Sequence, residues 1–161
     1  MDVPDGFTPL FRGSPFLDLV GPFYQKVEGD GLVVGLRIAE GHTNARGTAH
    51  GGLLVTMADI ALGYNASFAG TDKRAGATPS AALTTVNLSV DFVGSAALGD
   101  WVEARVDIQR VGGRLAFANA YLSVGSRRIV RASAVFAVIA TDAPAKGKSS
   151  TGDTNEPASG A

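Results

Sequence analysis

The 161-residue sequence contains no cysteine. This absence excludes disulfide bonds, zinc sites built from thiolates and thiol nucleophiles. Long apolar runs are also missing, because no stretch reaches the roughly 18 uninterrupted apolar residues of a membrane-spanning helix, and the N-terminus has no signal-peptide core. We therefore expect a soluble, cytoplasmic protein with no membrane partner and no metal site.

An excess of charge of one sign is absent as well. The chain has 14 Lys and Arg against 15 Asp and Glu, a formal net charge of −1, and its basic residues form no long block. A nucleic-acid-binding surface needs a clustered positive charge. We therefore do not expect a nucleic-acid partner.

The domain organisation follows from length and local composition. The length suits one domain with one sizeable core. Residues 141–161 lack aromatic and large aliphatic side chains, so they cannot bury enough apolar area to offset the entropy of ordering, and we predict a disordered tail. The sequence thus predicts a single domain over residues 1–140, with residues 1–13 as an irregular lead.

Several segments have the pattern of β-structure. After a short helix in "SPFLDLVGP", the run "FYQKVEGDGLVVGLRIAE" predicts a hairpin with a glycine turn. Residues 102–109 alternate apolar and polar side chains, which predicts a sheet with one core face and one wet face. Four strands with short turns between them are expected at residues 83–93, 101–111, 115–124 and 128–140.

The segment "NARGTAHGGLLVTMADIALGYNA" predicts the one long helix. From Gly52 to Ala61 only Thr56 and Asp59 are polar, so this helix cannot be an ordinary surface helix and must be covered. A curved antiparallel sheet of five or six strands around the central helix satisfies this requirement. The sequence thus predicts an α+β fold, with a second copy of the chain covering the remaining edges.

Two features of this helix could carry chemistry. Gly51 and Gly52 stand at its start, where free N–H groups and the positive end of the dipole could polarise a carbonyl, although both could simply permit a tight turn. Asp59 follows Gly51 at a distance of roughly 12 Å along one helix. The two groups could therefore serve one small reacting group only if two copies pair. Asp59 could act as nucleophile or general base, or accept a structural hydrogen bond from Thr56 or Tyr64.

Two polar residues before the helix are ambiguous on their own. His50 suits a role in shaping the helix start better than a catalytic one, because no serine-hydrolase signature accompanies it. Asn44 could orient water or donate to a carbonyl, but asparagine is also favoured in turns.

The segment "NARGTAHGGLLVTMAD" resembles the Asn-x-x-Gly-x-x-His-Gly-Gly-x(6)-Asp signature of hotdog-fold acyl-CoA thioesterases of the phenylacetate-degradation (PaaI) type. The resemblance continues through "LTTVNLSVDFVGSAALGDWVEARV" and "GGRLAFANAYLSVGSRRIVRASAVFAVI", and it covers roughly residues 17–139. One departure is Ser95, which stands where the family commonly has proline. The resemblance implies the hotdog fold.

The resemblance also implies roles for individual residues. Gly51 would donate its N–H to the thioester carbonyl, and Asp59 of the facing subunit would be the nucleophile or general base. Asn44 would orient the thioester or the water, and His50 would hold the loop and the helix start; Gly52 shares this substrate-binding or structural role. Thr85 aligns with a hydroxyl residue that assists the attacking water. Thr84, on the opposite strand face, is the fallback.

These roles predict hydrolysis of an aryl- or medium-chain acyl-CoA to a free acid and coenzyme A, by a homodimer or homotetramer. No cofactor is expected, because coenzyme A is part of the substrate, although an acyl-carrier-protein thioester would suit the same site. The alternatives are a hydratase or dehydratase acting on enoyl or 3-hydroxyacyl thioesters, and a non-catalytic acyl-CoA-binding module. Candidates for shaping the acyl pocket are Leu53, Leu54, Met57, Tyr64 and Phe68.

Overall fold

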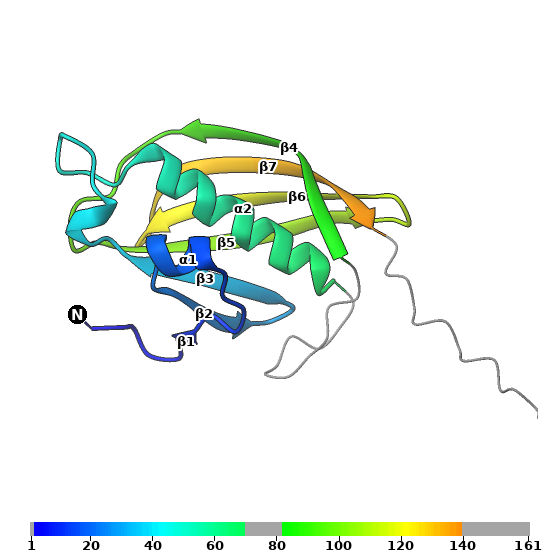
Figure 1. Cartoon of the computed structure of the whole chain (residues 1–161), viewed down its shortest axis with the longest axis horizontal. Coiled ribbons are helices and arrows are strands. Elements are labelled where there is room, and N and C mark those ends of the chain that lie inside the picture. Colours follow the sequence, from blue (N-terminus) through cyan, green and yellow to red (C-terminus); the bar gives the residue numbers. More distant parts are fainter. Residues whose placement is uncertain (1, 70–81, 140–161) are drawn as a thin grey trace, which may run out of the picture.

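The computed structural model describes residues 2–69 and 82–139. One long helix, α2 (Gly51–Ser67), crosses one face of an antiparallel sheet whose strand order is β1-β2-β3-β5-β6-β7-β4 (Figure 1). The strands are β1 (Thr8–Pro9), β2 (Phe23–Glu28), β3 (Gly31–Arg37), β4 (Ala82–Phe92), β5 (Trp101–Val111), β6 (Leu115–Val124) and β7 (Arg127–Ile139). A short helix, α1 (Pro15–Val20), and a 3-10 turn, Glu40–His42, complete the described elements. This is the predicted α+β arrangement of a sheet around one long helix.

The core lies between α2 and the inner face of the sheet. Met57, Ala61 and Leu62 of α2 are fully buried, as is Leu122 of β6, and Phe136 of β7 is only 2% exposed. Burying side chains of this size against the sheet is the main favourable contribution to folding. The position of α2, and of any functional group on it, is therefore fixed by the sheet.

The described elements follow the sequence prediction closely, with one addition. Strands β5 and β6 have the predicted bounds, β4 and β7 each begin and end one residue early, and α1 begins after Ser14, whose hydroxyl accepts a hydrogen bond from Leu17 N–H at 3.2 Å. Strand β1, which raises the number of strands to seven, lies within the lead that was expected to be irregular. The predicted tail at residues 141–161 lies outside the described residues.

The sheet covers only one side of α2. Val55, Ile60 and Tyr64, on the other side, are partly exposed even though two of them are aliphatic. The N-terminal segment covers part of this side, because the Phe11 ring lies 5.4 Å from the ring of Tyr64 and 5.2 Å from that of Phe68. One chain therefore does not enclose its apolar helix completely.

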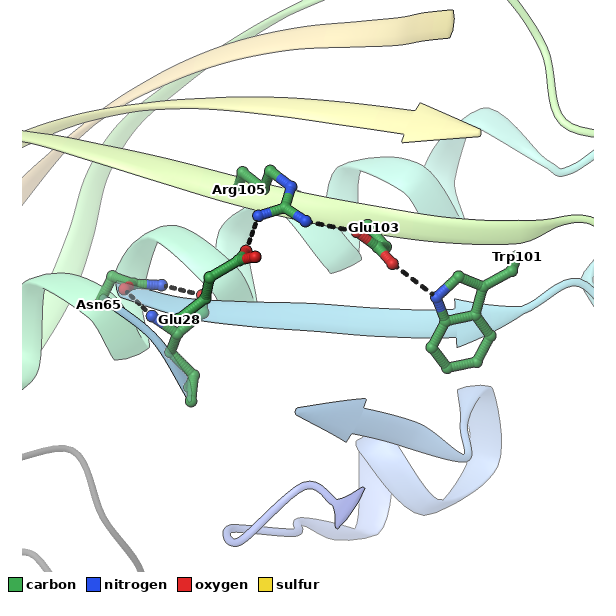
Figure 2. Close-up of polar contacts among 6 residues, drawn as sticks. Glu28, Asn65, Trp101, Glu103 and Arg105 are labelled. Carbon is green, nitrogen blue, oxygen red and sulfur yellow. Dashed lines mark hydrogen bonds and ion pairs between the residues drawn. The ribbon is translucent and has the colours of Figure 1, made fainter. Parts of the chain in front are cut away.

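A buried asparagine fixes the C-terminal half of α2 to the sheet. The Asn65 side chain, 1% exposed, accepts a hydrogen bond from Leu32 N–H and donates one to Leu32 C=O, each at 2.8 Å (Figure 2). Strand β5 pairs with β3 only from Val34 onward, so no residue of β5 bonds the backbone of Leu32. The side-chain amide of Asn65 makes those hydrogen bonds instead. A buried peptide group without such a partner would be costly.

The outer face of the same part of the sheet carries a row of polar contacts. The guanidinium of Arg105 on β5 pairs with Glu103 at 2.9 Å and with Glu28 at the end of β2, and Trp101 Nε1–H donates to Glu103 at 3.2 Å (Figure 2). These contacts span β2, β3 and β5 on the side of the sheet away from α2. Because the charges are solvent-exposed, each pair adds little to stability.

Candidate active site

The only carboxylate of α2 meets the edge strand of the sheet. Asp59 lies near the middle of the helix and is half-buried, and its Oδ1 accepts a hydrogen bond of 2.9 Å from the hydroxyl of Thr85 on β4. The two residues are 26 positions apart in the sequence. The structure thus brings together, within one chain, two of the residues to which the family resemblance gives a catalytic role.

An irregularity in β4 explains why Thr85 faces the helix. The pairing of β4 with β7 shifts register between Thr85 and Asn87, so that Val86 has no opposite residue on β7. Side chains alternate between faces along a regular strand, and an extra residue reverses that alternation. Both Thr85 and Leu88 therefore lie on the inner face, opposite the buried Phe136 and Ala134. Thr84, the fallback candidate, pairs with Ala137 and lies on the outer face.

The structural alternatives for Asp59 do not occur. The Thr56 hydroxyl donates instead to Gly52 C=O at 3.0 Å, and the Tyr64 hydroxyl donates to Arg12 C=O at 3.1 Å. Both hydroxyl groups thus donate to backbone carbonyls and not to Asp59. The alternative in which Thr56 or Tyr64 holds Asp59 by a structural hydrogen bond is therefore wrong.

The start of α2 has an unused backbone donor. His50 is the N-cap residue, and its Nδ1 accepts a hydrogen bond from Gly52 N–H at 3.0 Å, while its own N–H donates to His42 C=O at 2.8 Å. Gly51 is the first helical residue, so its N–H has no acceptor within the helix, and no other group in residues 2–69 or 82–139 accepts from it. His50 therefore caps the helix, and the Gly51 N–H has no acceptor among the described residues.

Asn44 lies in the loop that leads into this helix start. Its Oδ1 accepts from Arg46 N–H at 2.8 Å, and its Nδ2 donates to the Thr48 hydroxyl at 3.0 Å. Thr48 in turn pairs with Ala97 of the loop before β5. Asn44 therefore closes its own turn, and one of the two protons on its amide nitrogen is engaged there.

Ser95, the position where the sequence departs from the family signature, lies in the loop that joins β4 to β5. Its carbonyl oxygen accepts a hydrogen bond of 2.9 Å from a guanidinium nitrogen of Arg127. The neighbouring Ala96 C=O accepts from Ala49 N–H at 2.8 Å, which ties the same loop to the segment before α2. The loop around Ser95 is thus held by hydrogen bonds from Arg127 of β7 and from Ala49, just before α2.

The candidate residues form two separate groups in one chain. Asn44, His50 and Gly51 gather at the start of α2, whereas Asp59 and Thr85 lie about two turns further along. Eight helical residues correspond to roughly 12 Å, so the Gly51 N–H and the Asp59 carboxylate cannot contact one small group in the same chain.

Two cavities meet at the Asp59–Thr85 pair. One, of about 460 Å³, extends toward the start of α2, and the other, of about 300 Å³, extends toward its end. Both are lined by Asp59, Ile60 and Thr85, so they form one groove between α2 and β4 with two arms. We call them the N-terminal arm and the C-terminal arm.

The two arms have different linings. The residues that line only the N-terminal arm are Ser14, Phe16, Leu17, Val55, Thr56 and Leu88. The residues that line only the C-terminal arm are Arg12, Gly63, Tyr64, Ser67, Ala82, Leu83 and Phe136. Each arm has two hydroxyl groups of its own, so the difference between them is the cation, Arg12, which lines only the second arm.

Four of the five acyl-pocket candidates from the sequence do not face this groove. The four are Leu53, Leu54, Met57 and Phe68, which are buried in the core; Tyr64 is the one candidate that lines an arm. Burial raises the pKa of Tyr64, and the guanidinium of Arg12 partly opposes this shift. Arg12 and the residues of α1 were missed, because nothing in the sequence indicates that the N-terminal segment folds over the helix.

Among the described residues, no three side chains of His, Asp or Glu gather as metal ligands would, and none of the helices there has the length and apolar character needed to cross a membrane.

Comparisons with known proteins agree with this geometry. The family model for the thioesterase superfamily matches residues 46–130, just over half of the chain. A protein of Pseudomonas aeruginosa named Putative esterase PA0474 is 48% identical over 137 residues, which cover 84% of this chain and 97% of the relative.

Two solved structures show the same fold at low sequence identity. A mutant of the phenylacetic acid degradation protein PaaI from Thermus thermophilus superimposes with a TM-score of 0.66 at 20% identity, covering 78% of this chain and 100% of that one. A hypothetical thioesterase from Streptococcus pneumoniae, solved with coenzyme A, gives a TM-score of 0.62 at 19% identity over 72% of this chain and 87% of that one.

The match to the family model and the identity to the esterase relative decide the classification, and the superpositions confirm the predicted hotdog fold. The chain therefore belongs to the thioesterase superfamily and is a thioester hydrolase with the hotdog fold.

Proposed function

We propose that the protein hydrolyses aryl- or medium-chain acyl-CoA thioesters to the free acid and coenzyme A, with Asp59 as the nucleophile or general base. The observation that carries this proposal is the Asp59–Thr85 pair at the junction of the two arms of the groove. A carboxylate oriented by a hydroxyl group can attack a thioester carbon or take a proton from water. Coenzyme A as the thiol is supported by the coenzyme A complex of the streptococcal structure.

The carbonyl-polarising group would come from a second copy of the chain. Gly51 lies too far from Asp59 along α2 to serve the same thioester, but the Gly51 N–H is an unused donor at the positive end of a helix. In a two-fold dimer each copy can place its helix start against the partner's Asp59. Two equivalent sites then form, each from both chains.

Strand β4 supports one way of forming that dimer. It is the last strand of the sheet, and its exposed apolar side chains include Val86 and Phe92. The Phe92 ring lies beside Gly51, 3.3 Å from where a Cβ on that glycine would be, while Thr85 contacts Asp59. Antiparallel pairing of two β4 strands about an axis through Ser89 would set residue 85 opposite residue 92, because the bulge at Val86 takes up one residue of the spacing. The partner's helix start would then lie beside Asp59.

The reaction at such a site has a simple proton balance. The N–H of the partner's Gly51 would donate a hydrogen bond to the thioester oxygen as negative charge develops on it, and the second amide proton of Asn44 from the same copy would donate another. In the general-base route, Asp59 takes a proton from a water molecule positioned by Thr85, and the resulting hydroxide forms the new C–O bond. The C–S bond then breaks, and the thiolate leaves with the proton that Asp59 held.

A free-thiol assay across aryl, short, medium and long acyl-CoA substrates tests this function. Asp59→Asn and Asp59→Ala should abolish turnover of every substrate while the protein remains a folded oligomer. Undiminished thiol release in both variants would refute the mechanism. Hydration of a 2-enoyl-CoA, or tight acyl-CoA binding without thiol release, would contradict the hydrolase function itself.

A further inference from the structure

The C-terminal arm of the groove differs from an ordinary acyl pocket in containing a cation. Arg12 lines this arm together with Asp59 and Tyr64. No described residue forms an ion pair or a hydrogen bond with the guanidinium of Arg12. A guanidinium carries five donors and keeps its charge at any physiological pH, so it can pair with an anionic ligand.

The backbone holds Arg12 at this place. The Tyr64 hydroxyl donates a hydrogen bond of 3.1 Å to Arg12 C=O, and the adjacent Phe11 ring packs at 5.4 Å from the ring of Tyr64. Burial raises the pKa of Tyr64, so this hydroxyl keeps its proton at neutral pH and continues to donate. The segment that carries Arg12 is therefore attached to the wall of the arm.

The spacing relates Arg12 to the reacting end of the groove. Tyr64 follows Asp59 by five helical residues, which corresponds to roughly 7.5 Å along the axis. An extended acyl chain of about six carbons spans a distance of this order. The phosphates of coenzyme A are separated from the sulfur by the whole pantetheine arm, which is longer than this part of the groove. The pantetheine arm itself carries no anion, so an anionic group that reaches Arg12 from a thioester at Asp59 belongs to the acyl chain.

We propose that Arg12 is a specificity-determining residue that favours acyl thioesters whose acyl group ends in a carboxylate, the monothioesters of dicarboxylic acids. This inference rests on the proposed function, because it places the thioester at Asp59. The terminal carboxylate accepts hydrogen bonds from the guanidinium of Arg12 at the outer end of the arm, away from the carboxylate of Asp59. The methylene chain lies along the apolar residues between them, which include Ile60 and Leu83.

Two matched substrates test the proposal: adipyl-CoA and 6-methylheptanoyl-CoA, in which an uncharged isopropyl group replaces the terminal carboxylate. Arg12→Gln should lower kcat/KM for adipyl-CoA by roughly 10- to 100-fold, the effect of one charge-assisted pair. The same variant should leave kcat/KM for 6-methylheptanoyl-CoA within about threefold, and Arg12→Lys should retain part of the preference because it keeps the charge but not the planar fork.

Arg110→Gln is the matched control, because Arg110 lies in a hollow on the sheet face away from α2. It removes the same charge and should change neither rate. Equal losses of kcat/KM on both substrates in Arg12→Gln would show that Arg12 binds coenzyme A or stabilises the fold. An unchanged kcat/KM for adipyl-CoA would show that Arg12 does not contact the acyl group. Either result overturns the proposal. Failure of the unsubstituted chain to hydrolyse either substrate would instead contradict the proposed function on which the inference rests.

Discussion

Replacing Gly51 with proline removes one backbone donor and leaves the helix in place. Proline is favoured at the first helical position, because the N–H that it lacks has no intrahelical acceptor there. Proline also requires an extended residue before it, and His50 is extended, with φ −66° and ψ 134°. The substitution therefore deletes the proposed carbonyl-polarising group with little change in the backbone.

The magnitude follows from the loss of that single donor. Removing one hydrogen-bond donor to a developing oxyanion costs about 10²- to 10³-fold in kcat. Gly51→Ala is the matched control, because it adds the same Cβ, 3.3 Å from Cζ of Phe92, and keeps the N–H. A thiol-release assay on both variants, with circular dichroism to verify the fold, should show the large loss in Gly51→Pro alone. Equal kcat values in the two variants would refute the role of this N–H.

Three further predictions concern residues around the groove and the core. Thr85→Val should lower kcat by roughly 10- to 100-fold through loss of the hydrogen bond to Asp59, whereas Thr85→Ser should retain most activity; similar rates in the two variants would exclude a role for the hydroxyl. Asn65→Leu should lower the free energy of unfolding by about 2–5 kcal/mol, because it leaves the backbone N–H and C=O of Leu32 buried and unpaired. Chemical denaturation at fixed protein concentration measures this loss, and a value below about 1 kcal/mol would contradict the prediction. Burial raises the pKa of Tyr64 above its ordinary value of 10.0, so the contribution of the buried hydroxyl to folding stability should be complete below that pH and decrease as pH rises through the folded-state pKa. Denaturation curves between pH 8 and 11 should therefore depend less on pH for Tyr64→Phe than for the unsubstituted chain. Identical pH dependence of the two would contradict this.

The strands could be predicted because their pattern is regular. Residues 102–108 alternate apolar and polar side chains, and the structure gives β5 the predicted bounds. Strand β1 could not be predicted in the same way, since two residues are too few to show alternation. The helix was also predictable as an element. However, a helix that is apolar on nearly every side does not indicate which side faces the sheet. That is why Leu53, Leu54 and Met57 were offered for the groove although they lie in the core.

The contact between Asp59 and Thr85 illustrates a second limit. The bulge at Val86 decides which residues of β4 face inward, and a single extra residue leaves no clear signal in a sequence. The family resemblance indicated Thr85 and kept Thr84, on the opposite face of the strand, as the fallback. Arg12 lay beyond both kinds of reasoning, because its place depends on how the N-terminal segment folds back over α2.

Each active site is proposed to contain Gly51 from one copy and Asp59 from the other, and mixing two inactive variants tests this arrangement directly. Asp59→Asn and Gly51→Pro chains are unfolded together at equal amounts, refolded and assayed for thiol release. Random pairing gives about half mixed dimers, each with one site in which both groups are intact, so the mixture should recover about one quarter of the unsubstituted activity. Activity no higher than that of the two variants refolded separately would contradict a site shared between chains.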